Sequence, residues 1–335
     1  MTERTIFFAS DDRGVTPMLE VAVWSLLRYA GPETAYRVVI LSDAISKEKQ
    51  ARLTALFAEQ PRHTVRFFEG HDALQARAAD LPHHAWPLTT WARLFMPEFL
   101  PECSGLALYL DIDVYVCEDL GPLFEAGLGD ATIGCVPEKF YGDDLPTRAN
   151  LGNPPKEARY VNAGVLLMDL DRWRQERVTE RAAAFARRPD IHLQCADQDA
   201  LNGLLAGQIR MLHPRWNFSD GWIRRAARLP IDAVWWRGLK PLEAVEAALR
   251  PGILHFWGPH KPYRCNHRPE GWRYESALRE LGLLHGALPG TTFGKRVQNV
   301  FYRLFNRLLY ARLRRRLVTL RTQEQKTSQE PSHEQ

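Results

Sequence analysis

Short apolar runs alternate with helical patterns over the first 70 residues of the chain. The apolar runs read TIFFAS, YRVVILSD and HTVRFFEG and are expected to be strands, while the segments 15–28 and 47–59 between them are expected to be helices. Strands that alternate with helices in this way predict a parallel sheet with helices on both faces. The fold class is therefore α/β.

Three later segments continue the pattern. LALYLDIDVYV at 106–116 and ATIGCVPE at 131–138 are expected to be strands, and RYVNAGVLLMDLDRW at 159–173 is expected to be a strand that runs into a helix. Ligands of such sheets bind outside the carboxyl ends of the strands. Residues 10–12 (Ser-Asp-Asp) and the pair Asp111 and Asp113 both fall at predicted strand ends, so we expect them to share one crevice.

The segment 295–321 has the pattern of an amphipathic helix with a basic face. Residues 291–322 hold nine Lys or Arg and no acid, which leaves −5 on the remainder of a chain whose formal net charge is +4. Such a tail suits a membrane surface, a nucleic acid or packing on the domain. Its aromatic residues beside the arginines favour an anionic membrane surface, and no nucleic-acid partner is expected. Residues 323–335 are polar and expected to be disordered.

The cysteines, the N-terminus and the length of the apolar runs indicate where in the cell the protein is expected. The five cysteines are far apart and form no C-x-x-C pair, which argues against a disulfide framework or a zinc site and favours a reducing environment. The N-terminus lacks the pattern of a signal peptide, and no run reaches the roughly 18 apolar residues of a spanning helix. We expect a cytoplasmic protein whose tail holds it on the inner face of the membrane.

Asp111 and Asp113 lie inside one of the most apolar runs of the chain. A buried carboxylate costs several kcal/mol unless it is paired, and residues i and i+2 of a strand point to the same side. Two converging carboxylates suit a hard divalent cation, Mn²⁺ or Mg²⁺, that completes its coordination with substrate phosphates. The alternative is a pair of acids that cap a turn at a strand end.

A second polar group follows another short apolar run in GILHFWGPHKPYR. His255 could complete the coordination of Mn²⁺, and Lys261 could place a point charge on a phosphate. Gly258 would allow the backbone to approach the phosphates closely. Alone, His255 is better explained as a structural histidine, and only its combination with the Asp-x-Asp pair favours a metal ligand.

Five motifs in order along residues 5–265 resemble the retaining glycosyltransferases of family 8, which include bacterial lipooligosaccharide galactosyltransferases and glycogenin. They are LYLDIDVYV, TTWARLFMPEFL, YVNAGVLLMDLDRWR, ADQDALN and HFWGPHKPY. The resemblance implies one GT-A catalytic domain over 1–285, with a Rossmann-like mixed sheet flanked by helices. A basic helical tail at 291–322 follows it.

The resemblance also implies ligands and roles. The protein would use a UDP-sugar and Mn²⁺ or Mg²⁺, with Asp111, Asp113 and His255 as the metal ligands. The residues expected to bind the donor are Ala9 and Asp11 for uridine, Ile112 for ribose, Gly258 and Lys261 for the diphosphate, Arg93 for the sugar or the diphosphate, and Asn162, Asp197 and Gln198 for the transferred sugar. Glu138 is expected to contact the acceptor or the sugar. Arg13 and Gly14 depart from the family pattern, so stacking on the uracil is not expected.

Retention of configuration requires either a protein nucleophile or attack and departure on the same face of the sugar. The resemblance places Gln198 where it would contact the face of the sugar opposite the leaving group. An amide is a poor nucleophile. We therefore expect same-face substitution with a UDP oxygen as the base, and Asp197 is the alternative nucleophile. For ADQDALN the structural alternative is a helix N-terminus with favourably placed acids, including Asp199.

The function predicted is transfer of a hexose from UDP-galactose or UDP-glucose to a saccharide or lipid-linked acceptor, in lipopolysaccharide or surface-glycan synthesis. The alternative is a phosphohydrolase of the haloacid dehalogenase type, whose motif also reads Asp-x-Asp. That motif lies near the start of its domain, whereas here it follows three strand-helix units. A sugar-nucleotide binding module without transfer activity is a third reading, which the intact ADQD and HFWGPHK motifs disfavour.

Overall fold

The computed structural model describes residues 2–82, 87–219, 221–222, 239–258, 261–264, 270–286, 288 and 293–329. The chain forms two compact units, residues 1–212 and 213–335. The predicted catalytic domain at 1–285 thus spans the first unit and part of the second.

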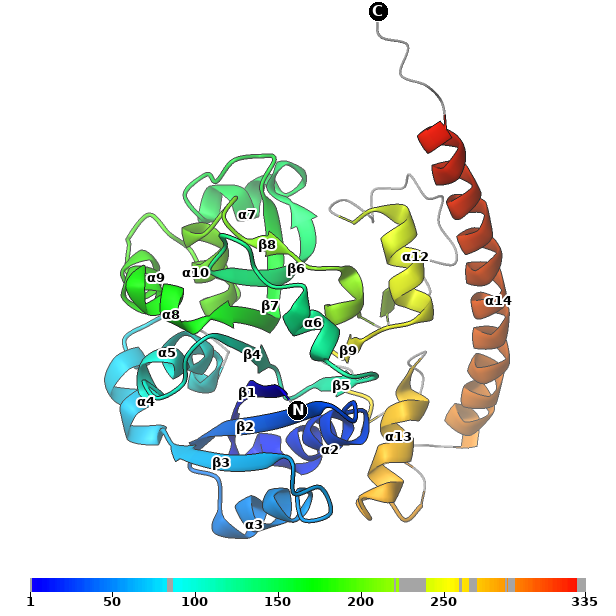
Figure 1. The fold of residues 1–335 in the computed structure, drawn as a ribbon, viewed down its shortest axis with the longest axis horizontal. Helices are drawn as coiled ribbons and strands as arrows, with labels where there is room; N and C mark the ends of the chain where they lie inside the picture. The colour runs from blue at the N-terminus through cyan, green and yellow to red at the C-terminus, as the bar shows by residue number, and fades with distance from the viewer. Residues whose placement is uncertain are drawn as a thin grey trace, which may run out of the picture. The chain divides into compact units, whose positions relative to one another are not determined.

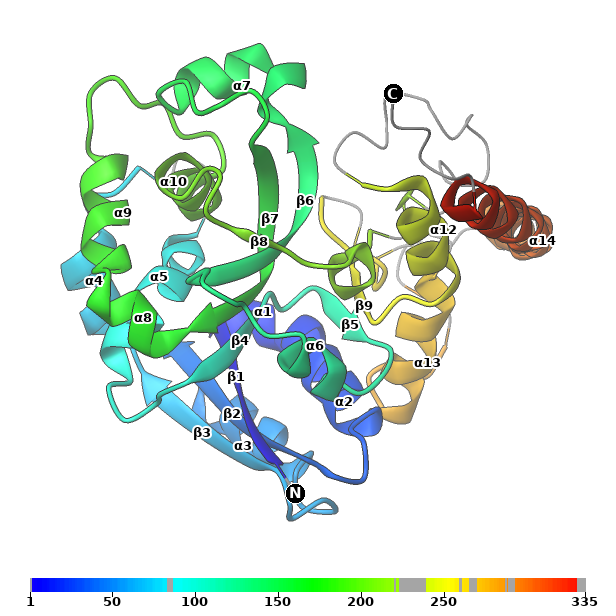
Figure 2. The same ribbon diagram turned by 45° about the horizontal axis from the view of Figure 1, so that its top comes forward.

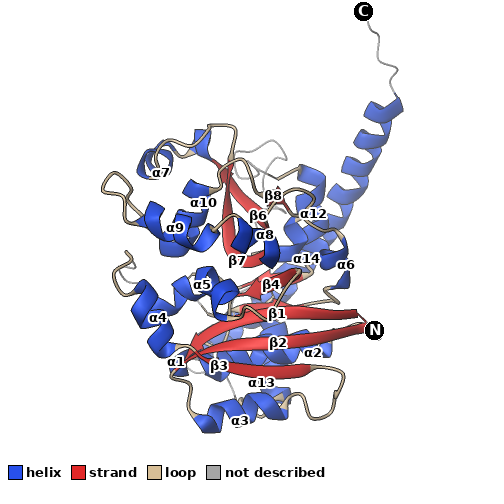
Figure 3. Ribbon diagram, turned by 60° about the vertical axis from the view of Figure 1, so that its left-hand side comes forward, coloured by secondary structure: helices blue, strands red, loops and turns tan. Residues whose placement is uncertain are grey.

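The first unit is built on a seven-stranded mixed sheet in the order β3-β2-β1-β4-β7-β6-β8 (Figures 1 and 3). The first four strands in this order are parallel, β7 is antiparallel to both β4 and β6, and β8 is parallel to β6. The mixed GT-A-like sheet is therefore confirmed. The strands are β1 (Thr2–Asp11), β2 (Thr34–Asp43), β3 (Thr64–Glu69), β4 (Leu106–Leu110), β6 (Ile133–Phe140), β7 (Arg159–Asp169) and β8 (Arg210–Met211), and β5 (Val114–Val116) lies outside this sheet.

Helices cover the sheet because its central strands are apolar on both faces. Phe7 and Ala9 of β1 belong to a buried cluster with α4, α5, α8, α9 and α10, which Figure 2 shows along one face. Ile6 and Phe8 alternate with them and are also fully buried. The helical segments are α3 (Lys47–Ala55), α4 (His71–Ala78), η2 (Leu88–Trp91), α5 (Ala92–Phe99), α6 (Gly121–Glu125), η3 (Tyr141–Asp143), α7 (Leu145–Asn150), α8 (Leu170–Gln175), α9 (Val178–Ala186) and α10 (Ala196–Leu204).

The helix predicted at 15–28 is divided. It forms α1 (Asp12–Gly14), η1 (Val15–Leu19) and α2 (Glu20–Arg28). Thr16 inside η1 has extended backbone angles, φ −108° and ψ 122°. Pro17 explains this break, because the ring of a proline disfavours the helical conformation in the residue before it.

The second unit contains η4 (Pro214–Asn217), α12 (Pro241–Leu249), β9 (Ile253–His255), α13 (Gly271–Glu280) and α14 (Phe293–Gln329). α14 contacts α12, and Arg321 pairs with Glu246 at 2.9 Å. None of the helices in the described part of the chain combines the length and apolarity that a membrane crossing requires.

The tail differs from its prediction in two ways. The helix continues to Gln329, into the segment 323–335 that was predicted to be disordered, and 330–335 lie outside the described residues. The apolar stripe predicted from the sequence includes Leu304, Leu308 and Leu309, and of these Leu309 is buried, whereas Leu304 and Leu308 are 57% and 69% exposed. Packing on α12 thus covers only part of that stripe.

Candidate active site

The Asp-x-Asp segment is a turn and not a strand interior. β4 ends at Leu110, and the Asp111 backbone N–H donates to the Gly164 carbonyl at 2.8 Å before the chain turns toward β5. Asp111 and Asp113 are both half-buried. The strand argument for their convergence is therefore wrong, and the turn itself sets the direction of the two carboxylates.

The turn lies against the segment after β1, as predicted. A Cβ atom added to Gly14 would lie 2.6 Å from Ile112 Cδ1 and 2.6 Å from Ser10 Oγ. Any side chain at this position would require the ends of the Ile112 and Ser10 side chains to shift. The departure of Gly14 from the family pattern thus has a packing reason, and the segment after β1 lies beside the Asp-x-Asp turn.

The segment after β1 is fixed by its own acids. Asp11 accepts the Gly14 N–H at 2.8 Å, and Asp12 accepts from the Ser46 N–H at 3.0 Å and from Lys49 Nζ at 2.7 Å. The hydrogen bond from Lys49 is the main cause that lowers the pKa of Asp12 to about 2. Ala9 is buried in the core.

Arg93 is buried and its guanidinium contacts both carboxylate motifs. Nη2 donates to Asp111 Oδ1 at 2.9 Å, Nη1 donates to the Ala163 carbonyl at 2.6 Å, and Nε lies 2.7 Å from Asp197 Oδ2. This last contact is an ion pair without hydrogen-bond alignment, because the Nε–H donates to the Thr90 carbonyl at 3.3 Å. Burial raises the pKa of Asp197 to about 7, and Arg93 opposes that shift.

Gln198 and Asn202 of α10 bind the backbone of β7 where β4 no longer pairs with it. β4 pairs with β7 only from Val165 onward. Gln198 Oε1 accepts the Ala163 N–H at 3.0 Å, and the Asn202 amide bonds both the N–H and the carbonyl of Val161, at 2.7 and 2.8 Å. These side-chain amides provide hydrogen-bond partners for backbone N–H and carbonyl groups of β7 that β4 does not pair with. Figure 2 shows α10 beside β7.

Asn162 and Glu138 lie close to this region of the sheet. Asn162 Oδ1 accepts the Gly164 N–H at 3.0 Å, which matches the role of a residue that bonds local backbone. Val136 of β6 pairs with Asn162, and the register shifts between Pro137 and Lys139, so Glu138 stands in a bulge. Bulges redirect side chains and often lie beside active sites.

In the second unit, His255 is 2% exposed at the end of β9. Its Nδ1 lies 2.9 Å from Oδ1 of the buried Asn217, an oxygen that can only accept, so the proton is on Nδ1 and Nε2 carries the lone pair. Gly258 has φ +86°, a conformation that favours glycine. Lys261 donates to the Phe256 carbonyl at 3.2 Å.

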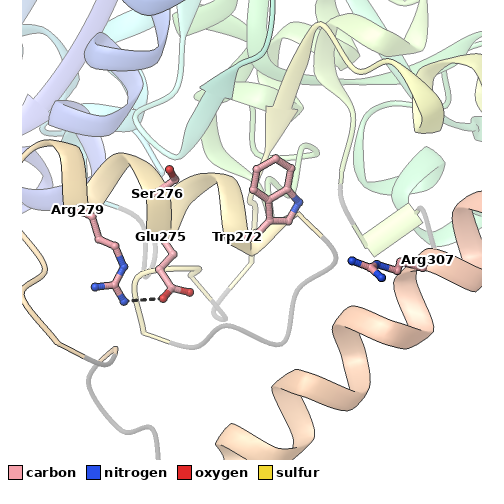
Figure 4. A pocket seen from close by; sticks show the side chains of 5 residues that line it. All are labelled: Trp272, Glu275, Ser276, Arg279 and Arg307. Carbon is pink, nitrogen blue, oxygen red and sulfur yellow. Dashed lines mark hydrogen bonds and ion pairs between the residues drawn. The ribbon is translucent and has the colours of Figure 1, made fainter.

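The second unit also contains a shallow cavity of about 510 Å³ between α13 and α14 (Figure 4). Its lining consists of Trp272, Glu275, Ser276, Arg279 and Arg307. On the α13 side of this cavity, Arg279 pairs with Glu275 at 2.9 Å, so the charges of these two residues balance each other.

Two residues that support the predicted site were given no role by the sequence analysis. Asn217 orients His255 from 38 residues away, and Tyr160 bonds both Asp199 and Gln198 from 39 and 38 residues away. Only the strand-helix topology brings these pairs together. Asp199 itself was noted only as an acid at a helix N-terminus.

Comparison with known proteins identifies the family. The model of "Glycosyl transferase family 8" matches residues 6–266. The chain belongs to glycosyl transferase family 8. This glycosyltransferase is 27% identical over 261 residues to general stress protein A of Bacillus subtilis, a match that covers 75% of this chain and 86% of the relative.

Two further relatives carry activities in their names. The lipopolysaccharide 1,3-galactosyltransferase of Salmonella typhimurium is 24% identical over 250 residues, with 72% of this chain and 68% of that protein covered. The crystal structure of galactosyltransferase LgtC with donor and acceptor sugar analogs is 28% identical, with a TM-score of 0.66 over 87% of this chain and 99% of that one. The family 8 chain spans about half the length of several other relatives. The phosphohydrolase alternative finds no support in these matches.

Proposed function

We propose that this family 8 glycosyltransferase moves a hexose from UDP-galactose or UDP-glucose to a saccharide or lipid-linked saccharide, in lipopolysaccharide or surface-glycan synthesis, with retention of configuration. The family match and the names of the relatives support this choice. The observation that carries it is Arg93, whose guanidinium contacts both Asp111 of the Asp-x-Asp turn and Asp197 of the ADQD motif. One buried cation thus ties the predicted metal motif to the predicted sugar motif.

Asp111, Asp113 and His255 would each supply one ligand atom to Mn²⁺ or Mg²⁺. The donor set fits, because carboxylate oxygens suit both ions and an imidazole suits Mn²⁺. Asn217 holds His255 in the tautomer that a metal ligand needs, as outer-sphere partners of ligating histidines do. The ion would supply positive charge to the diphosphate leaving group.

The remaining polar groups would bind the donor. Asp11 and the backbone at Ala9 and Ile112 would contact the nucleoside. Lys261 would place its ammonium on a phosphate, and Gly258 would let the backbone come close. Arg93 would act through the two carboxylates that it holds, because its guanidinium is already engaged by them and by Ala163.

Gln198 would contact the transferred sugar, with Asn162 and Glu138 nearby in the sheet. An amide does not form a stable covalent intermediate, and Asp197 is 3% exposed and paired with Arg93, which makes it a poor nucleophile. We therefore favour same-face substitution, in which a UDP oxygen accepts the proton of the acceptor hydroxyl.

The tail would place the enzyme on the inner face of the cytoplasmic membrane. At 100° per residue, Leu304, Leu308 and Val318 lie on the side of α14 opposite the buried Leu309 and Leu313, and all three are exposed. Exposed arginines, Arg307, Arg312 and Arg315, accompany them. Apolar groups between cations suit an anionic membrane surface.

The test is UDP release from purified protein with a panel of UDP-sugars, with and without Mn²⁺. Slow release from one donor, dependent on Mn²⁺ and abolished in Asp113→Asn, is expected. Asp190→Asn removes an exposed carboxylate that pairs with Arg188 and is the matched control, expected to act like wild type. Equal release by wild type and Asp113→Asn would remove the metal assignment, and no release from any UDP-sugar would remove the donor class.

A further inference from the structure

Gln198 makes two hydrogen bonds that together fix which way its amide faces. Oε1 accepts the Ala163 N–H at 3.0 Å, and Nε2 donates to the Tyr160 hydroxyl at 2.9 Å. A backbone N–H can only donate, so the Gln198 oxygen must be the atom that faces Ala163. The amide nitrogen consequently faces Tyr160, and one of its two hydrogens is used there.

The Tyr160 hydroxyl is able to accept from Gln198 because its own hydrogen is directed elsewhere. It donates to Asp199 Oδ1 at 2.5 Å, within a buried environment. Burial raises the pKa of Tyr160 well above its ordinary value of 10, so the hydroxyl keeps its proton and remains a donor to Asp199. This leaves only its lone pairs for Gln198.

Asp199 is in turn held by the loop before α10. Its Oδ2 accepts the backbone N–H groups of Gln194 and Cys195 at 2.6 and 2.8 Å. The order of donation therefore runs without ambiguity from the Gln198 amide to Tyr160 and from Tyr160 to Asp199. Asp199 is 4% exposed and is engaged through both oxygens.

The Tyr160 ring is also fixed in place. Lys139 Nζ lies 4.7 Å from its centroid, and Tyr141 packs against it edge to face at 5.9 Å. The Tyr141 hydroxyl, by contrast, is buried without a hydrogen-bond partner. The two tyrosines share one cluster, and only the hydroxyl of Tyr160 reaches the Gln198 amide.

We propose that Tyr160, anchored by Asp199, is a positioning residue for sugar transfer: it holds the Gln198 amide in the one orientation in which its second N–H and its second oxygen lone pair meet the transferred sugar. The inference deepens the proposed function and rests on it. A hydrogen-bonding group pre-set in one orientation needs no reorganisation when the sugar reacts.

The first test compares Tyr160→Phe with Tyr141→Phe, using the donor found active in the panel. Tyr160→Phe keeps the ring and removes the acceptor for Gln198, and we expect kcat to fall about 10- to 100-fold with little change in donor KM. Tyr141→Phe removes a hydroxyl that has no partner and is expected to leave both constants unchanged. Equal rates in the two variants would overturn the proposal.

A double-mutant comparison separates positioning from a merely structural role. In a Gln198→Ala background, Tyr160→Phe has no amide left to orient and is expected to cause no further loss of kcat. A loss as large as in the wild-type background would show that Tyr160 acts otherwise, and would overturn the proposal.

A readout independent of turnover distinguishes this inference from the proposed function. The side-chain amide protons of Gln198, assigned by their loss in Gln198→Ala, should exchange faster with solvent in Tyr160→Phe than in wild type or Tyr141→Phe. Wild type that turns over no UDP-sugar would refute the proposed function alone. Unchanged exchange in Tyr160→Phe would refute the orientation of the amide, whatever the turnover.

Discussion

Arg93 donates through Nη2 to Asp111 Oδ1 at 2.9 Å, from a side chain that is almost entirely buried. Its plane also stacks over Tyr109, with the guanidinium carbon 4.6 Å from the ring centroid. A cation so enclosed is retained only because Asp111 and Asp197 balance it, and coulombic contacts with both raise the pKa of Arg93 against the opposing effect of burial.

Replacing Arg93 should therefore affect stability and catalysis together. Arg93→Met leaves two carboxylates without their cation, and we expect a loss of about 3 kcal/mol or more in the free energy of unfolding, with turnover nearly abolished. Urea unfolding and UDP release measure the two effects. Arg187→Met breaks an exposed pair with Asp80 and should cost less than about 1 kcal/mol. Similar costs for the two variants would contradict the role given to Arg93.

Asn217 should control metal affinity without being a ligand. Asn217→Ala removes the acceptor of the His255 Nδ1–H, and we expect the affinity for Mn²⁺ to fall about 10- to 100-fold. Titration of Mn²⁺ followed by electron paramagnetic resonance measures this, and thermal unfolding checks that the variant is folded. Gln208→Ala, on an exposed turn, is the control. Unchanged affinity in a folded Asn217→Ala would remove His255 from the ligand set.

A side chain at Gly14 should disturb the packing of the Asp-x-Asp turn. Its backbone angle, φ −73°, suits any residue, so the obstacle to Gly14→Ala is steric: the new Cβ would lie 2.6 Å from Ile112 Cδ1 and from Ser10 Oγ, and 3.3 Å from Asp11 Oδ1. We expect a loss of about 1–3 kcal/mol in stability and a higher KM for the donor. Gly286→Ala meets no atom within 4 Å and is the matched control. A Gly14→Ala variant with wild-type stability and KM would show that the crevice adapts.

His63 should make stability depend on pH. Its Nδ1 accepts the Tyr36 N–H at 2.9 Å, and burial lowers its pKa to about 4. Since the unfolded chain binds this proton near pH 6.5, the stabilisation is present above pH 6.5 and is lost as pH falls toward 4, at up to about 1.4 kcal/mol per pH unit. Urea unfolding at several pH values, for wild type and His63→Gln, measures it. Parallel curves for the two proteins would refute the assignment.

The exposed side of α14 should determine membrane binding. Replacing Leu304 and Leu308 together by serine removes exposed apolar surface without touching the side buried against the domain, and we expect several-fold weaker sedimentation with vesicles that contain anionic lipid. Leu145→Ser removes a leucine of similar exposure, 56%, from the first unit. If both proteins bind vesicles as wild type does, α14 serves only to pack on α12.

The sequence predicted the strands of the sheet well because buried parallel strands are continuous apolar runs. At Asp111 it favoured a strand over the turn that it kept as an alternative, since Ile112 and the residues after Asp113 continue the apolar run. It failed on the tail because a periodic stripe gives the direction of an apolar face but not how much of that face a neighbouring helix covers. The contacts of Asn217 with His255 and of Tyr160 with Asp199 could not have been predicted, because these partners lie 38 and 39 residues apart and no spacing links them.

The amides of Gln198 and Asn202 act on β7 as a neighbouring strand would, and this limits how such a protein can diversify. A residue that completes a sheet cannot change freely, so position 198 is constrained by folding before any sugar is bound. Glu138 stands in the bulge of β6, where the regular ladder of strand hydrogen bonds is interrupted. We expect proteins of this kind to acquire new sugar preferences first at the bulge, with α10 inherited almost unaltered.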